Sequence, residues 1–299
     1  MKTFVYKYVT GHSYQNGIIR NVWEQKEFSS QKELFDFLVT NKEQILEHKK
    51  AVEKHCEGSI SVLVDSALQV SKAAIYENDK EAGILKRTIL ANTYWWMDSM
   101  SDVHLGRGAE GDSAVFTETI KNRVNKIYPI DQHNWSLDGR IGKTLNIYEA
   151  PISWRVLGIG KTGMTEGLFA DAQIERAKNA ARYEDYLNNE IDQHSVGMQY
   201  IDIQLAVNDQ EDFPKEYEVY QKYINKIGNR QAVESQGYFF AVGKARLKEY
   251  SAVIAGANEL TPVIQPAGAT GKNEPSGDTQ KEQEFSMAIL KLSSKLLTK

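Results

Sequence analysis

The sequence predicts an α+β fold in which short strands alternate with a smaller number of helices. Segments rich in β-branched and aromatic residues predict strands over 87–98, 145–150, 153–160, 167–174, 194–207 and 238–256. Helical spacing or helix-favouring composition predicts helices over 114–127, 175–190 and the charged insertion 209–236. This interleaving favours a barrel-like α+β domain over residues 87–264 and disfavours a doubly wound parallel sheet.

Residues 1–86 predict a small N-terminal β-α-β extension. Its strand-like segments are 3–10, 17–28 and 59–73, with one helix from Ser30 to about residue 55. Ser30 followed by Glu33 matches the pair that caps a helix N-terminus, which marks where this helix begins. We find no chemistry-bearing motif in this extension.

The composition changes after Pro262. Residues 265–284 are rich in Gly, Pro, Ser, Thr and charge, and therefore predict a flexible linker. Residues 285–299 carry apolar side chains three and four positions apart, which predicts a short amphipathic helix. Two interpretations stay open: a helix that docks on its own domain, or a tethered hook for a partner.

Composition narrows the possible classes of function. The net charge of −4 comes from 36 basic and 40 acidic residues, so no basic excess marks a nucleic-acid binder. No run of 18 apolar residues is present, and we expect no membrane-spanning helix. Cys56 is the single cysteine, which excludes an internal disulfide and fits a reducing, cytoplasmic setting.

Two glycine-rich patterns resemble nucleotide-binding motifs without their context. Gly158, Gly160 and Gly163 match G-x-G-x-x-G, but a turn and a strand follow where a helix is required. Gly160-Lys161-Thr162 resembles a P-loop, but Arg155 stands where the first glycine is needed. A β-hairpin turn is the preferred interpretation. The six histidines lack metal-ligand spacing, so we expect neither a metal nor a cofactor.

Three segments in order carry the strongest functional signal. They are 128–149, with His133 and Ile141-Gly142-Lys143; 184–203, with Ser195-Val196-Gly197-Met198; and 245–263, with Glu249-Tyr250-Ser251 and Ala257-Asn258. In this order and spacing they resemble the prohead proteases of tailed phages. Residues 95–108 resemble that family's opening segment, with Ser101 where a glycine is usual. The resemblance covers about residues 87–264 and omits the N-terminal extension and the insertion.

The resemblance implies a fold and a function. It implies a bent β-barrel ringed by helices, as in the related herpesvirus maturation proteases. It also implies a serine endopeptidase that cleaves scaffold protein, extensions of the major capsid protein and often itself. The setting would be the host cytoplasm, inside the immature prohead, and a homo-oligomer is a further possibility.

The chemistry of serine activation suggests roles for Ser195 and His133. A serine hydroxyl needs a neutral imidazole within hydrogen-bond reach to take its proton. His194 is adjacent to Ser195, but neighbouring residues in a strand point to opposite faces, so His194 is not the expected base. We therefore expect Ser195 to be the nucleophile and His133 the general base.

Glu249 is the candidate for the third role. It shares a strand face with Leu247, Ser251 and Val253, and a carboxylate on such an apolar face is costly unless it is paired. Pairing with His133 would satisfy this need. Asp102, Asp131 and Asp138 remain rivals for this role. The alternative explanation for Glu249 is a strand face that is solvated at its start.

Two other functions are open at this stage. One is a catalytically inactive, scaffold-like or minor capsid assembly protein, which would not need Ser195 and His133 together. The other is an esterase or related hydrolase with the same dyad. The chain lacks the G-x-S-x-G elbow that exposes serine in most such enzymes.

Overall fold

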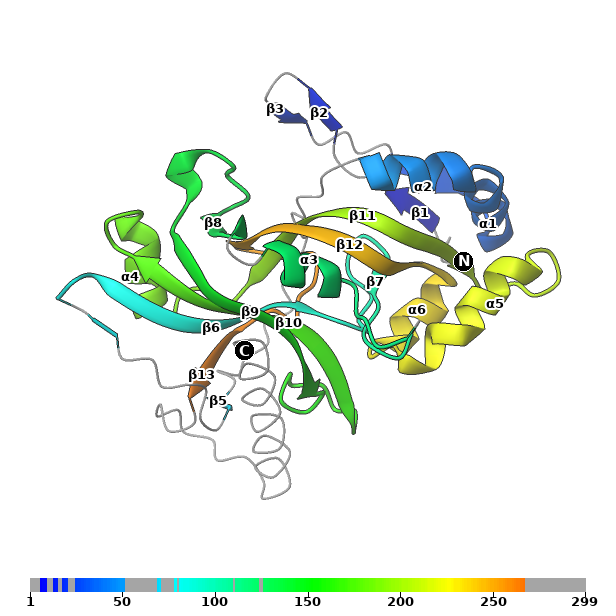
Figure 1. The fold of residues 1–299 in the computed structure, drawn as a ribbon. Coiled ribbons are helices and arrows are strands. Elements are labelled where there is room, and N and C mark those ends of the chain that lie inside the picture. Colours follow the sequence, from blue (N-terminus) through cyan, green and yellow to red (C-terminus); the bar gives the residue numbers. More distant parts are fainter. Residues whose placement is uncertain are drawn as a thin grey trace.

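The structure is a computed structural model that has the predicted α+β composition (Figure 1). It describes residues 6–9, 13–15, 18–20, 25–51, 69–70, 78–79, 81–109, 111–123 and 126–266. Two larger sheets form its centre, and the helices lie around them. Cys56, the segment 267–284 and the predicted helix 285–299 lie outside the described residues.

The first sheet has the order β5-β13-β6-β10-β9. Its antiparallel centre consists of β6 (Ile84–Thr93), β10 (Met164–Glu175) and β9 (Gly142–Ser153). β13 (Val263–Pro266) and β5 (Gln69–Val70) complete one side. β10 is buried along most of its length.

The second sheet is built on β12 (Tyr238–Ala252), which pairs antiparallel with β11 (His194–Val207). On its other edge β12 pairs in parallel with two short strands. β7 (Asp102–His104) lies beside the start of β12, and β8 (Pro129–Asp131) lies beside its end. The residues that follow β8 are thereby delivered to the C-terminal end of β12.

The middle of that edge of β12 is covered by the segment around α3 (Thr117–Arg123). Ala245 N–H donates to Val115 O, Leu247 N–H donates to Thr119 Oγ1, and Thr119 Oγ1–H donates to Ala245 O. These bonds satisfy backbone groups between the two short strands that would otherwise form an open sheet edge.

The remaining helices gather mainly at one end of the molecule (Figure 1). They are α1 (Gln31–Thr40), α2 (Lys42–Ala51), α5 (Pro214–Tyr223) and α6 (Arg230–Gln236). α4 (Ala180–Leu187) lies at the opposite end. The insertion 209–236 is helical as predicted, with a 3₁₀ turn at Ile224–Lys226.

The N-terminal extension differs from its predicted pattern. It begins with short strands: β1 (Tyr6–Val9), β2 (Ser13–Gln15), β3 (Ile18–Arg20) and β4 (Gln25–Phe28). Ser30 caps α1 through Glu33 N–H, as predicted. The expected single helix is instead two, because the chain leaves helical geometry at Asn41, whose amide caps Phe37 O. Most of the predicted strand 59–73 lies outside the described residues.

Several boundaries in the central region also differ, and the helix predicted over 114–127 begins only at Thr117. The predicted strand 153–160 is wrong: β9 ends at Ser153, and a run of turns follows. The helix predicted over 175–190 is limited to α4, because Asn179 caps its start through Arg182 N–H. The glycine-rich segment 158–163 lies in the connection between antiparallel β9 and β10, as the hairpin interpretation predicted.

One hydrophobic cluster joins both sheets and the helices. It includes Phe35 and Leu38 of α1, Leu90 of β6, Phe169 of β10 and Phe240 of β12. The α1–α2 pair is therefore packed into the same core as the sheets that carry the candidate site. Burial of apolar surface contributes roughly 25 cal/mol per Å², so this shared core couples their stability.

A buried ion pair fastens α2 to the second sheet. Lys49 Nζ lies 2.6 Å from Asp102 Oδ1, and Tyr200 Oη donates to Asp102 Oδ2 at 2.6 Å. Lys49 Nζ also lies 4.0 Å from the centre of the Phe240 ring. A buried charge is tolerated only when it is paired, so Asp102 of β7 depends on the N-terminal helices.

We predict that Lys49→Met lowers the free energy of unfolding by about 3–5 kcal/mol, because it leaves the buried Asp102 carboxylate without its bonded cation. Chemical denaturation followed by circular dichroism measures this loss. Lys32→Met is the matched control, since its partner Asp212 is exposed, and it should unfold close to wild type. Unfolding of Lys49→Met at the wild-type denaturant concentration would contradict the coupling.

Candidate active site

The backbone around His133 is held in an unusual conformation. Gln132 and His133 have φ values of 45° and 54°, in the left-handed region that costs roughly 1–2 kcal/mol for a residue with a side chain. Gln132 N–H donates to Ala252 O, and Asn134 N–H donates to Asp131 O. Such strain persists only where surrounding contacts over-determine it, and it is concentrated at functional sites.

His133 and Glu249 are in direct contact. His133 Nδ1 lies 2.6 Å from Glu249 Oε1, and both side chains are only 3% exposed. Because the carboxylate needs a donor, the proton is assigned to Nδ1, which leaves the lone pair of the imidazole on Nε2. This is the tautomer that can accept a proton from a nucleophile.

Ser251 completes this buried network. Its hydroxyl donates to Glu249 Oε2 at 2.7 Å and accepts the backbone N–H of His133 at 3.1 Å. Its Oγ also lies 3.3 Å from His133 Nδ1. The Glu249 carboxylate therefore has one oxygen bonded to the imidazole and the other to a hydroxyl.

Ser195 lies on the neighbouring strand, directly opposite Ser251. Side chains at opposing positions of an antiparallel pair point to the same face, with Cβ atoms about 4.5–5.5 Å apart. Ser195 therefore shares the face of β11–β12 that carries Glu249 and Ser251. The imidazole contacts that the structure gives for His133 are with Glu249 and Ser251, both through Nδ1. In enzymes without substrate, the bond between nucleophile and base is often long and tightens only on binding.

Gly197 explains how the carboxylate fits between the strands. It is opposite Glu249 in the register, and a methyl group built on Gly197 would lie 2.3 Å from Glu249 Oε1. Only a residue without Cβ leaves this space. The "S-V-G" part of the motif thus has a physical explanation that sequence reasoning missed: glycine makes room for the partner of His133.

The three rival aspartates have other environments. Asp102 is bonded to Lys49 and Tyr200. Asp131 faces Arg182, with 3.5 Å between Oδ2 and Nε, and Asp138 is exposed. Of the four candidate carboxylates, Glu249 is the one bonded to His133.

His194 is bonded to groups other than Ser195. Its Nδ1–H donates to Thr261 O at 2.7 Å, and its Nε2 accepts from Tyr186 Oη at 2.9 Å. Burial lowers the pKa of His194 to about 4, although the bond to Thr261 opposes this shift. Both nitrogens are occupied by partners other than Ser195, and the ring stays neutral at pH 7.

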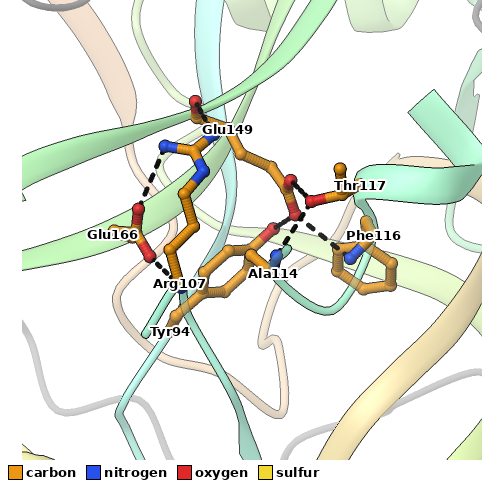
Figure 2. Close-up of polar contacts among 7 residues, drawn as sticks. All are labelled: Tyr94, Arg107, Ala114, Phe116, Thr117, Glu149 and Glu166. Carbon is orange, nitrogen blue, oxygen red and sulfur yellow. Dashed lines mark hydrogen bonds and ion pairs between the residues drawn. The ribbon is translucent and has the colours of Figure 1, made fainter. Parts of the chain in front are cut away.

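A second buried carboxylate, Glu149, makes a different kind of cluster (Figure 2). Glu149 accepts hydrogen bonds from Tyr94 Oη, Phe116 N–H and Thr117 Oγ1. Arg107 bonds Glu166 and the Glu149 carbonyl. Burial raises the pKa of Glu166, while the Arg107 N–H opposes the rise. These contacts tether residues 107–117 to β9 and β10, and we assign the cluster a structural role.

Ser101 has φ of 63°, in the left-handed region that favours glycine. Within the described ranges, no group of three His, Cys, Asp or Glu side chains could hold a metal ion. Among the helices that the structure describes, none is both long and apolar enough to cross a bilayer.

We predict that stability falls as the pH drops from 6.5 towards 4, in part because of His194. The unfolded imidazole binds a proton at about pH 6.5, whereas the folded one resists it, so the loss approaches roughly 3 kcal/mol. His194→Gln lacks this titration. The difference in unfolding free energy between wild type and His194→Gln should therefore shrink as pH falls from 7.5 to 4. A difference independent of pH would contradict this environment.

Comparisons of the chain with protein-family models, with curated proteins and with solved structures gave no match.

Proposed function

We propose that the protein is a serine endopeptidase in which Ser195 is the nucleophile, His133 the general base and Glu249 the group that orients and stabilises the imidazole. The observation that carries this proposal is the 2.6 Å contact between His133 Nδ1 and Glu249 Oε1, on the sheet face shared with Ser195. Three distant segments of sequence converge there. A buried imidazole–carboxylate pair beside a serine is the arrangement that hydroxyl activation requires.

The proposed reaction has two stages. His133 Nε2 takes the proton of Ser195 Oγ as the oxygen attacks the peptide carbonyl, and Glu249 stabilises the resulting imidazolium. The imidazolium then protonates the leaving amine, so the peptide C–N bond breaks and an acyl-serine forms. Water, deprotonated by His133, attacks the acyl-serine, and the ester C–O bond to Ser195 breaks. The imidazolium returns its proton to Ser195 Oγ, and the new carboxyl terminus is released.

The finer fold and the substrates follow from the resemblance to prohead proteases. We propose that the two sheets correspond to the bent β-barrel of that family, ringed by helices. The substrates would be scaffold protein, extensions of the major capsid protein and the enzyme itself. The location would be the immature prohead in the host cytoplasm, with a homo-oligomer as a further possibility.

One surface feature supports a polypeptide substrate. The residues directly after His133 are exposed, and Leu137 is 93% exposed. An extended chain could reach the His133 loop from this side. By contrast, Ser195 itself is only 5% exposed.

We predict that Ser195→Ala and His133→Ala each reduce peptide cleavage by about 10⁴–10⁶-fold, and that Glu249→Gln reduces it by about 10²–10⁴-fold. The test is co-expression with candidate capsid and scaffold proteins, with mass spectrometry of the products. Asp138→Asn is the matched control, because its carboxylate is exposed, and it should cleave normally.

Two results would contradict the proposal. Normal trimming by Ser195→Ala would show that Ser195 is not the nucleophile. Full activity in Glu249→Gln, with loss in Asp131→Asn or Asp102→Asn, would move the third role to an aspartate.

A further inference from the structure

Ser251 occupies a position between the two groups that would activate the nucleophile. It lies on β12 two residues after Glu249, is fully buried, and faces Ser195 across the strand pair. The Ser251 hydroxyl oxygen lies 3.3 Å from the imidazole Nδ1. Its contacts decide whether it is a rival nucleophile or a supporting residue.

The hydrogen bonds exclude Ser251 as the nucleophile. Its hydroxyl proton is directed at Glu249 Oε2, at 2.7 Å, and the nearest imidazole nitrogen is Nδ1, which already faces Glu249 Oε1. A nucleophile must give its proton to a nitrogen lone pair and must reach the substrate. Ser251 has 0% exposure and meets neither condition.

The same contacts make Ser251 a bridge between base and carboxylate. As a donor, it fixes Glu249 Oε2 and thereby orients Oε1 towards the imidazole. As an acceptor, it takes the backbone N–H of His133, the second of two consecutive residues in the left-handed region. The hydroxyl therefore holds both members of the pair in one geometry.

Gly197 limits the carboxylate from the other strand. A side chain there would overlap Glu249 Oε1, so the carboxylate lies directly against the β11 backbone. Between this backbone and the Ser251 hydroxyl, both oxygens of the Glu249 carboxylate are bonded. Ser251 restrains the carboxylate through its hydrogen bond to Glu249 Oε2.

We propose that Ser251 is a positioning residue that locks the His133–Glu249 pair in its reactive geometry and tautomer. The catalytic consequence rests on the proposed function, but the effect on His133 does not. Removal of the hydroxyl should lower kcat about 10–100-fold, the size of effect known for the partners that orient metal-binding histidines. KM should change little, because Ser251 is too buried to touch substrate.

Two variants of equal shape isolate the hydroxyl. Ser251→Thr retains it, whereas Ser251→Val replaces it with a methyl group, and both side chains suit a strand. Ser251→Ala removes it without added volume. Ser153→Ala is the matched control: Ser153 is equally buried, lies at the end of β9 and accepts the Arg155 N–H.

The first measurement is nuclear magnetic resonance of the full chain labelled with ¹⁵N-histidine. The ring signals of His133 are assigned by their loss in His133→Gln. We expect a protonated Nδ1 and an unprotonated Nε2 in wild type, Ser195→Ala, Ser153→Ala and Ser251→Thr. In Ser251→Ala and Ser251→Val, the Nδ1–H signal should broaden through exchange with water, or the two tautomers should mix.

The second measurement is the kinetics of peptide cleavage by the same variants. We expect kcat to fall in Ser251→Ala and Ser251→Val and to recover in Ser251→Thr. Wild-type His133 signals in both Ser251→Ala and Ser251→Val would overturn the inference, whatever the activity. Absence of peptidase activity in wild type would instead refute the proposed function, and the histidine signals would still decide the role of Ser251.

Discussion

The candidate site depends on a buried carboxylate that must be paired. Glu249 is 2% exposed, and a charge removed from water is tolerated only when each oxygen finds a donor. Here His133 and Ser251 are those donors. The geometry of the base is thus a consequence of satisfying Glu249, and the strain at Gln132 and His133 is the cost of placing the imidazole there.

The architecture of β12 serves this pairing. β11 pairs with one edge of β12. The other edge is covered by β7, the segment around α3, and β8. β8 runs parallel to the end of β12 and ends beside Ala252. The chain then continues to His133, whose backbone N–H donates to Ser251. The register with β11 then sets Ser195 and Gly197 opposite Ser251 and Glu249. A shift of one residue would move these side chains to the other face.

Local patterns allowed much of this to be predicted. The strand over 194–207 matches β11 to the residue, and the cap at Ser30 was readable because it depends on residues three apart. The apolar face around Glu249 signalled a need for a partner. The pairing register could not be read from the sequence, because it depends on contacts between distant strands. For this reason the importance of Ser251 and Gly197 was missed. The turns after Ser153 were also mistaken for a strand.

The most direct test of the account is the site of covalent labelling by a fluorophosphonate, in which an activated serine oxygen displaces fluoride from phosphorus. Mass spectrometry of the digested full chain identifies the modified residue. The account predicts an adduct on Ser195 that disappears in His133→Ala, with Ser251 unmodified. An adduct on Ser251, or labelling of Ser195 that persists without His133, would contradict it.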